Sequence, residues 1–295
     1  MPQYFPFDPN PRRPAVALPP GACDSQFHVF GARERYPVRP DAAYEMPTAT
    51  IERALALHRS LGIARGVIVQ ATTYGADHQI VLDGLAAAGA SYRGCANAIV
   101  LRRADDAYMA KLHAAGIRGA RFSRPGLGAS LARDDLPRAL ARVKELGWYV
   151  KIQPEAGGIS SGIEPFQRLD IPVLIDHMGR PDPAAGDADP NLRKMLELVS
   201  RGNFWVMLSL GEKTSKTGPP WDDVVPVAQR LIAAAPERCI WGSDWPHPLS
   251  TKQPPNDGEL VELAARYAGD AATLQKMLVD NPARFFGFAL PCEET

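Results

Sequence analysis

The amino-acid sequence predicts an α/β fold of the (β/α)8 barrel class, built as a single domain. Short apolar segments alternate with segments of helical periodicity, which is typical of a parallel sheet covered by helices. Eight strand segments can be counted, and eight favour closure of the sheet into a barrel. The length of 295 residues suits one such barrel, which needs about 250 residues.

The first half of the chain supplies four strands and four helices. The strands are expected where apolar or alternating residues run between turn residues, at 22–30, 66–70, 93–98 and 119–122. The helices are expected where apolar residues recur every three or four positions, at 50–61, 77–88, 105–115 and 136–146. Residues 1–20 are rich in proline and predict an extended arm before a single barrel at 21–295.

The second half repeats the pattern. Its strands are expected at 148–153, 171–177, 204–208 and 238–242. Its helices are expected at 162–169, 191–200, 221–235, 257–268 and 271–281. No low-complexity tract or linker separates these segments, so the sequence favours one domain.

Composition excludes several classes of partner. The formal net charge is +0, which gives no electrostatic reason to expect nucleic acid or an anionic membrane surface as a partner. No apolar run approaches the roughly 18 residues of a membrane span, and residues 1–20 lack a signal-peptide core. The four cysteines are widely spaced without a Cys-x-x-Cys pair. We therefore expect a cytoplasmic protein that acts on a small molecule, with its oligomeric state left open.

The segment 241–248, Trp-Gly-Ser-Asp-Trp-Pro-His-Pro, places an acidic side chain at the end of a strand. The apolar residues at 238–241 predict a short buried strand, and Asp244 follows where a Pro-rich loop begins. Between two Trp rings a carboxylate is poorly solvated. Burial is expected to raise its pKa and to make it a better base than a surface Asp. The alternative is an Asp that only caps the following turn.

Two further strands end in polar residues. In 22–30 the period-two pattern places Asp24, Gln26 and His28 on one face, and the strand at 171–177 ends in Asp176-His177. One such His alone is more often structural. Three strands that all end in His or Asp instead favour a shared site, because working residues of such barrels lie at the C-terminal ends of strands. His28, His177 and Asp244 are the predicted catalytic residues.

Other candidates follow from the same rule. Arg121 ends the strand at 119–122, and its guanidinium can clamp a carboxylate with two parallel bonds; the alternative is an internal ion pair. His247 either contacts substrate or fixes its loop, and the second role is favoured. Asp24 is expected to brace the first strand or to orient its neighbours, and Asp176 to be structural. His58 and His113, on helices, and His78 are expected to be background. The remaining substrate-binding candidates are Gln26, Thr72, Thr73, Arg124, Gln153 and Lys213.

These motifs together resemble the amidohydrolase superfamily. The resemblance rests on Ile-Asp-His-Met-Gly-Arg-Pro at 175–181, on 241–248 and on shorter blocks, from about Pro19 to about Phe288. It is strongest for the branch that contains 2-pyrone-4,6-dicarboxylate hydrolase, 4-sulfomuconolactone hydrolase and D-galactarolactone isomerase. This branch implies a (β/α)8 barrel and hydrolysis of a cyclic ester. It also implies a carboxylate-binding role for Arg121 and substrate contact for Tyr44. Arg124 is a substitute for a further basic residue of the loop, whereas Gln153 and Lys213 depart from the pattern.

One departure concerns metal binding. Most members carry His-x-His on the first strand, where this sequence has Gln26-Phe27-His28. A carboxamide oxygen is a weak ligand for a transition metal compared with imidazole. The resemblance to the pyrone dicarboxylate hydrolase also implies a metal-independent site. No cofactor is therefore predicted; the alternative is one zinc or manganese ion held by His28, His177 and Asp244.

The predicted activity is opening of a carboxylated lactone or pyrone by direct water attack, in catabolism of aromatic or sugar-acid compounds. Asp244 accepts the proton of water, while His177 and His28 donate hydrogen bonds to the carbonyl oxygen. Arg121, with Lys213, holds the substrate carboxylate. Two alternatives stay open. A lactone isomerase would use a substrate hydroxyl in place of water, and a non-catalytic barrel would only bind a carboxylated ligand.

Overall fold

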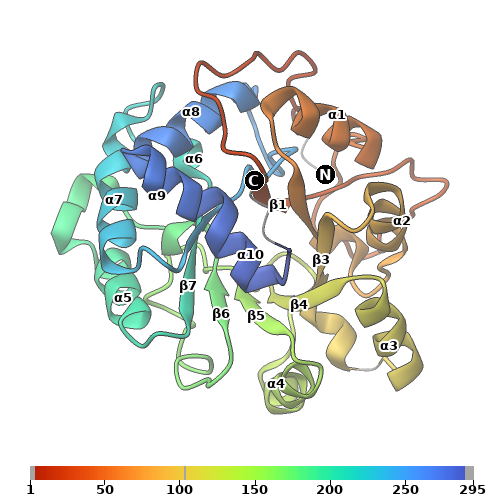
Figure 1. Cartoon of the computed structure of the whole chain (residues 1–295). Helices are drawn as coiled ribbons and strands as arrows, with labels where there is room; N and C mark the ends of the chain where they lie inside the picture. Colours follow the sequence, from red (N-terminus) through yellow and green to blue (C-terminus); the bar gives the residue numbers. More distant parts are fainter. Residues whose placement is uncertain (1–3, 103, 290–295) are drawn as a thin grey trace.

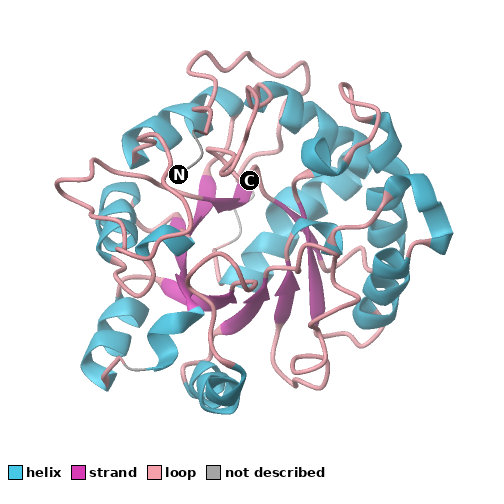
Figure 2. Ribbon diagram, turned by 180° about the vertical axis from the view of Figure 1, so that it is seen from behind, coloured by secondary structure: helices cyan, strands magenta, loops and turns pink. Residues whose placement is uncertain are grey.

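The structure is a computed structural model that describes residues 4–102 and 104–289. Eight parallel strands form one sheet in the order β1 to β8, curved into a barrel with helices around it (Figures 1 and 2). The strands are β1 Cys23–Phe27, β2 Arg65–Val69, β3 Tyr92–Asn97, β4 Ile117–Phe122, β5 Tyr149–Ile152, β6 Val173–Ile175, β7 Phe204–Leu208 and β8 Cys239–Trp241. The prediction of a (β/α)8 barrel is confirmed.

The helices follow the predicted alternation, apart from an additional short helix at Gly211–Thr214 and one predicted helix that is absent. They are α1 Ile51–Leu61, α2 Gln79–Ala88, α3 Asp106–Ala114, α4 Leu136–Glu145, α5 Pro190–Val199, α6 Gly211–Thr214, α7 Val225–Ala234, α8 Asp257–Ala268, α9 Ala271–Gln275 and α10 Asn281–Phe286. The helix expected at 162–169 is wrong, because this stretch consists of turns. Ile163 and Phe166 are buried at helical spacing, but the amide of Phe166 bonds to the carbonyl of Ile163 within a turn. A turn satisfies a three-residue spacing as well as a helix does.

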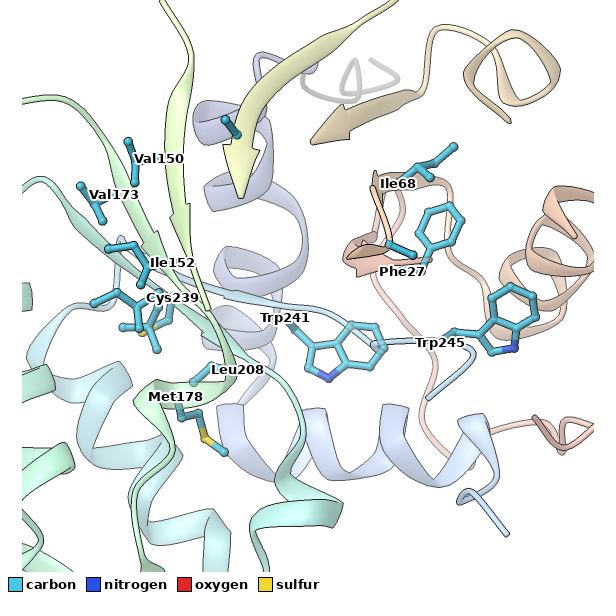
Figure 3. Packing of buried hydrophobic residues seen from close by; sticks show 14 of the residues in the cluster. Phe27, Ile68, Val150, Ile152, Val173, Met178, Leu208, Cys239, Trp241 and Trp245 are labelled. Carbon is cyan, nitrogen blue, oxygen red and sulfur yellow. The ribbon is translucent and has the colours of Figure 1, made fainter. Parts of the chain in front are cut away.

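Two apolar layers hold the barrel. Inward-facing strand residues such as Cys23, Val67 and Trp205 pack with Phe286 of α10. Arg65, at the start of β2, donates to the carbonyl of Val279 in the π-helical segment Lys276–Asp280, which joins α9 to α10 and lies at the N-terminal ends of the strands (Figure 1). The larger layer lies between strands and helices, and Figure 3 shows part of it. The C-terminal ends of the strands are left for a site.

The cysteines on the strands are buried and free. Cys23, Cys95 and Cys239 lie on β1, β3 and β8. Each packs as a small apolar side chain. Cys292 lies outside the described residues.

The barrel closes irregularly between β8 and β1. Beyond the last residue of β8, the amide of Asp244 donates to the carbonyl of Gln26 (2.9 Å), and the amide of His28 donates to that of Trp245 (2.7 Å). The register of β1 against β2 also shifts between Asp24 and Phe27. The predicted common face of Asp24, Gln26 and His28 is therefore wrong. The shift turns Asp24 towards His58 of α1, whereas Gln26 and His28 reach Asp244.

Residues 4–20 contain no helix or strand and run along the barrel to α8. Arg12 pairs with Glu262 of α8, where Nη2 lies 2.6 Å from Oε2. Nearer the start, the ring of Phe7 packs against Trp245, with ring centroids 4.7 Å apart. Within the described part of the chain, none of the helices combines the length and the apolar character needed to cross a membrane.

Candidate active site

Asp244 lies three residues beyond the end of β8, between β8 and the first strand. Its Oδ1 accepts a hydrogen bond from Gln26 Nε2 at 2.6 Å, and His28 Nε2 lies 3.3 Å from the same oxygen. No hydrogen bond joins Oδ2 to the described residues. Two neighbours therefore hold one carboxylate oxygen, and the other keeps its lone pairs for chemistry.

The pKa of Asp244 departs from the expectation. Burial raises the pKa of this carboxyl, as predicted. The hydrogen bond from His28, the nearby rings of His177 and His28 and the charge of Lys213 together outweigh burial, and they hold the pKa well below its usual range. The prediction of a raised pKa is therefore wrong, because it omitted the positive partners that the fold brings to this strand end. Asp244 is ionised at neutral pH.

His28 connects Asp244 to the second strand. Its Nδ1 lies 2.7 Å from the carbonyl oxygen of Val69, which only accepts, so Nδ1 carries a proton. The contact of Nε2 with Asp244 then needs a second proton between the two groups.

His177 follows β6 and has the opposite hydrogen-bonding role. Arg121 Nη2 lies 3.4 Å from Nε2, and a guanidinium only donates, so Nε2 is the acceptor. Its Nδ1 then carries the proton and donates to Ser209 Oγ at 2.9 Å. Burial lowers the pKa of His177 to about 3, which keeps the ring neutral. In this arrangement His177 orients Arg121 and has no proton to offer a carbonyl from Nε2.

Arg121 ends β4 and belongs to a buried ionic group. Its Nε donates to Asp176 Oδ2 at 2.8 Å, and Lys151 Nζ lies 2.6 Å from Asp176 Oδ1. Burial raises the pKa of Asp176, but the charges of Lys151 and Arg121 outweigh burial and lower it. The internal ion pair that the sequence left open is therefore present. It uses Nε and leaves Nη1 and the outer edge of the guanidinium for an anion.

Tyr44 lies beside this group and is held by the two predicted threonines. Its hydroxyl oxygen accepts from Thr72 Oγ1 at 3.1 Å, and its carbonyl accepts from Thr73 Oγ1 at 2.7 Å. The hydroxyl proton of Tyr44 is thereby left free to donate. Burial raises the pKa of this tyrosine, with the charges of Arg121 and Asp244 close enough to act on it.

The other candidates lie around this centre. Gln153 accepts from the amide of Arg124 at 3.4 Å, and both line a cavity of about 330 Å³ beside the ends of β4 and β5. Lys213, on α6, is exposed and donates to the carbonyl of Pro248. His247 is fully buried and contacts Asp257 of α8, which fits the role of fixing its loop.

Sequence reasoning missed several contributing residues. Lys151 lies on β5, a strand whose other residues are apolar or aromatic. A lysine in such a strand is unusual and could have been recognised as a candidate site residue. Ser209 directly follows β7. It could have been found by the rule that working residues of such barrels lie at the C-terminal ends of strands. Arg180, in the motif at 175–181, is partly buried with its Nε unpaired among the described residues. Its pKa is lowered by burial and by Arg124 and Arg121. Three arginines thus gather where a substrate anion would bind.

The predicted background histidines are structural. His58 is buried between Asp24 and the hydroxyl of Tyr92, and His78 contacts the amide of Asn97. His113 accepts from the indole of Trp148 at 3.0 Å. Each ring has a hydrogen-bonding partner away from Asp244.

The donor set at the strand ends does not fit a catalytic metal. Across residues 4–102 and 104–289, no three His, Cys, Asp or Glu side chains converge as a metal site would need. Asp244 Oδ1 is held by Gln26 and His28, and His177 Nε2 faces the guanidinium of Arg121. A cation placed on these atoms would meet an existing positive charge.

Known proteins match this chain over almost its whole length. A 2-pyrone-4,6-dicarboxylate hydrolase from Comamonas testosteroni is 38% identical over 94% of this chain and 93% of its own. A 4-sulfomuconolactone hydrolase from Hydrogenophaga intermedia is 35% identical over 94% and 92%. A crystal structure from Agrobacterium tumefaciens superimposes with a TM-score of 0.79 at 28% identity, covering 94% of this chain and all of the other. The profile described as "Amidohydrolase" matches residues 23–288, and the chain accordingly belongs to the amidohydrolase family.

Proposed function

We propose that this protein is a hydrolase that opens a carboxylated lactone or pyrone by direct attack of water, without a metal ion. The observation that carries the proposal is that Asp244 and Arg121 lie at the same end of the barrel. Among the described residues, Oδ2 of Asp244 and Nη1 of Arg121 have no hydrogen-bonding partner. The relatives named as hydrolases of a pyrone dicarboxylate and of a sulfomuconolactone support the substrate class.

Substrate binding would use the positive charge of the arginines that lie near the ends of β4 and β6. Arg121, Arg124 and Arg180 lie close enough for their charges to act on one another, as the lowered pKa of Arg180 indicates. An anionic substrate relieves this repulsion, and a planar guanidinium binds a carboxylate with two parallel bonds. Because Asp176 already holds Nε of Arg121, the substrate carboxylate would bind the two Nη atoms.

The chemical step would run through Asp244. The oxygen of water attacks the carbonyl carbon while Oδ2 of Asp244 takes the water proton. The carbonyl becomes an oxyanion, for which the free hydroxyl proton of Tyr44 is the donor. When the oxyanion collapses, the ring C–O bond breaks and the leaving oxygen takes the proton from Asp244. The predicted donor role of His177 passes here to Tyr44, while His177 orients Arg121 for the substrate carboxylate.

A matched panel of lactones tests this proposal. Each cyclic ester is offered as its free carboxylate and as its methyl ester or amide, and ring opening is followed by mass spectrometry. Hydrolysis of the carboxylates with at least tenfold lower kcat/KM for the neutral partners is expected. Equal turnover of charged and neutral partners would remove the anion-binding role, and a lack of turnover across the whole panel would remove lactone hydrolysis.

A further inference from the structure

The turn that carries Asp244 is strained. Asp244, His247 and Leu249 all have positive φ, at 59°, 61° and 66°, in the left-handed region that L side chains rarely adopt. The amide of His247 donates to the carbonyl of Asp244 at 2.8 Å and so closes the turn. A backbone of this kind persists only where its surroundings hold it in place.

The two halves of the turn are held by different elements. Upstream, the backbone of Asp244 and Trp245 bonds to that of Gln26, within β1, and of His28, just after β1. Downstream, the side chain of His247 reaches α8, where Nε2 lies 3.1 Å from Asp257 Oδ1. Both side chains are essentially inaccessible to solvent, at 0% and 1% exposed. The pair therefore fixes the C-terminal end of the turn to the first residue of a three-turn helix.

We propose that the His247–Asp257 pair sets the position of Asp244, so that His247 is a positioning residue for the base rather than a substrate ligand. The inference rests on the proposed function only in the role of Asp244. His247 acts on Asp244 through the backbone. Asp257 holds the imidazole of His247, and the amide of His247 holds the carbonyl of Asp244.

The surroundings of His247 favour its charged form. Burial lowers the pKa of His247, but the carboxylates of Asp257 and Glu212 outweigh burial and raise it, against the opposing charge of Lys213. Asp257 comes from α8, while Glu212 and Lys213 come from α6. Because the folded-state pKa is raised, the contribution of the pair is complete below the unfolded pKa of about 6.5. It is lost as pH rises through the folded-state value.

Two variants of Asp257 separate anchoring from charge. Asp257→Ala removes the anchor, and we expect kcat to fall at least tenfold while KM changes less than twofold, because the arginines that bind the anion are untouched. Asp257→Asn keeps an acceptor but removes the charge. A smaller loss of kcat is expected, with the alkaline limb of the pH profile moved to lower pH. Arg266→Gln, which breaks an exposed ion pair of the same helix with Asp222, is the matched control and should behave as wild type.

Amide hydrogen exchange gives a readout that needs no substrate. In Asp257→Ala the amides of the non-proline residues of 244–250 should exchange at least tenfold faster, with β1 to β7 unchanged. If this variant does not fold, Asp257→Asn should show the same change to a lesser degree. Unchanged exchange in the turn would overturn the inference, as would wild-type kcat in Asp257→Ala. Failure to find any lactone substrate would instead count against the proposed function and leave the exchange result standing.

Discussion

Asp244 combines a low pKa with one free oxygen, and this combination shapes its chemistry. An ionised carboxylate is available at neutral pH without prior loss of a proton. The low pKa also makes Asp244 a weak base in isolation, so proton transfer must be coupled to attack of water on the carbonyl. Gln26 contributes by holding Oδ1, and Oδ2 has no hydrogen-bonding partner among the described residues.

Replacing the base tests this role. Asp244→Asn is nearly isosteric and keeps an oxygen that can accept from Gln26, so the fold should persist. Turnover should fall by about a hundredfold or more, the range of general acid–base catalysis. Steady-state kinetics on the best lactone of the panel measure the loss. Retention of more than about a tenth of wild-type turnover would exclude Asp244 as the base.

The guanidinium of Arg121 offers a second test at this scale. Arg121→Met removes the charge that holds the substrate carboxylate, whereas Arg121→Lys keeps charge but loses the planar fork. The kcat/KM for a carboxylated lactone should therefore fall far more in the Met variant than in the Lys variant. If both variants matched the wild type, Arg121 would serve only to neutralise Asp176.

The hydrogen bonds made by the candidate metal ligands also predict the metal content of the purified protein. Because both ring nitrogens of His28 and of His177 already have hydrogen-bonding partners, a metal would find only Oδ2 of Asp244, and purified protein should hold well under one equivalent of zinc or manganese. It should keep its activity in a strong chelator. Elemental analysis and assays before and after chelation check this. Near-stoichiometric metal, with activity lost on stripping and regained on refilling, would make Asp244 a ligand.

At the scale of elements, the junction of β1 and β8 depends on Asp24. This buried carboxylate accepts from the amide of Ser243 at 2.9 Å, from the amide of Gln26 at 3.1 Å and from the hydroxyl of Ser243. His58 of α1 lies 3.2 Å away. One side chain thus joins the first strand, the segment after the last strand and the first helix.

Removal of this carboxylate should lower the stability of the fold. Asp24→Ala leaves buried donors unpaired, and we expect it to lower the free energy of unfolding by about 3 kcal/mol, as for other broken buried pairs. Urea unfolding followed by circular dichroism measures the change. Asp222→Ala, at an exposed ion pair, is the control and should stay within about 0.5 kcal/mol of wild type. A similar small effect for Asp24→Ala would show that the junction is held by backbone bonds alone.

The sequence predicted most elements because their periodicity has a local cause. Both 204–208 and 257–268 are found as predicted, since a strand buried on both faces is apolar throughout and a helix buried on one side repeats apolar residues every three or four positions. At 162–169 the same apolar spacing came from turns. The face of Asp24 was misassigned because a register shift in β1 depends on pairing with β2, which no local pattern encodes.

At the scale of the whole molecule, the candidate site lies on the irregular junction that closes the barrel. Gln26, His28 and Asp244 supply both the closing backbone bonds and the polar side chains, so closure and site formation are one structural event. The sequence could predict which strand ends carry polar groups. It could not predict the hydrogen-bonding role of His177 or the pKa of Asp244. Both depend on Arg121 and His28, which come from distant strands.

Turnover of the best carboxylated lactone in water enriched in ¹⁸O tests the central claim most directly. Direct attack of water predicts a product heavier than the substrate by the mass of one labelled water, with the label in the newly formed carboxylate and no loss of label incorporation in the presence of a chelator. A product of unchanged mass would show that a substrate hydroxyl, not water, is the nucleophile and would contradict the account.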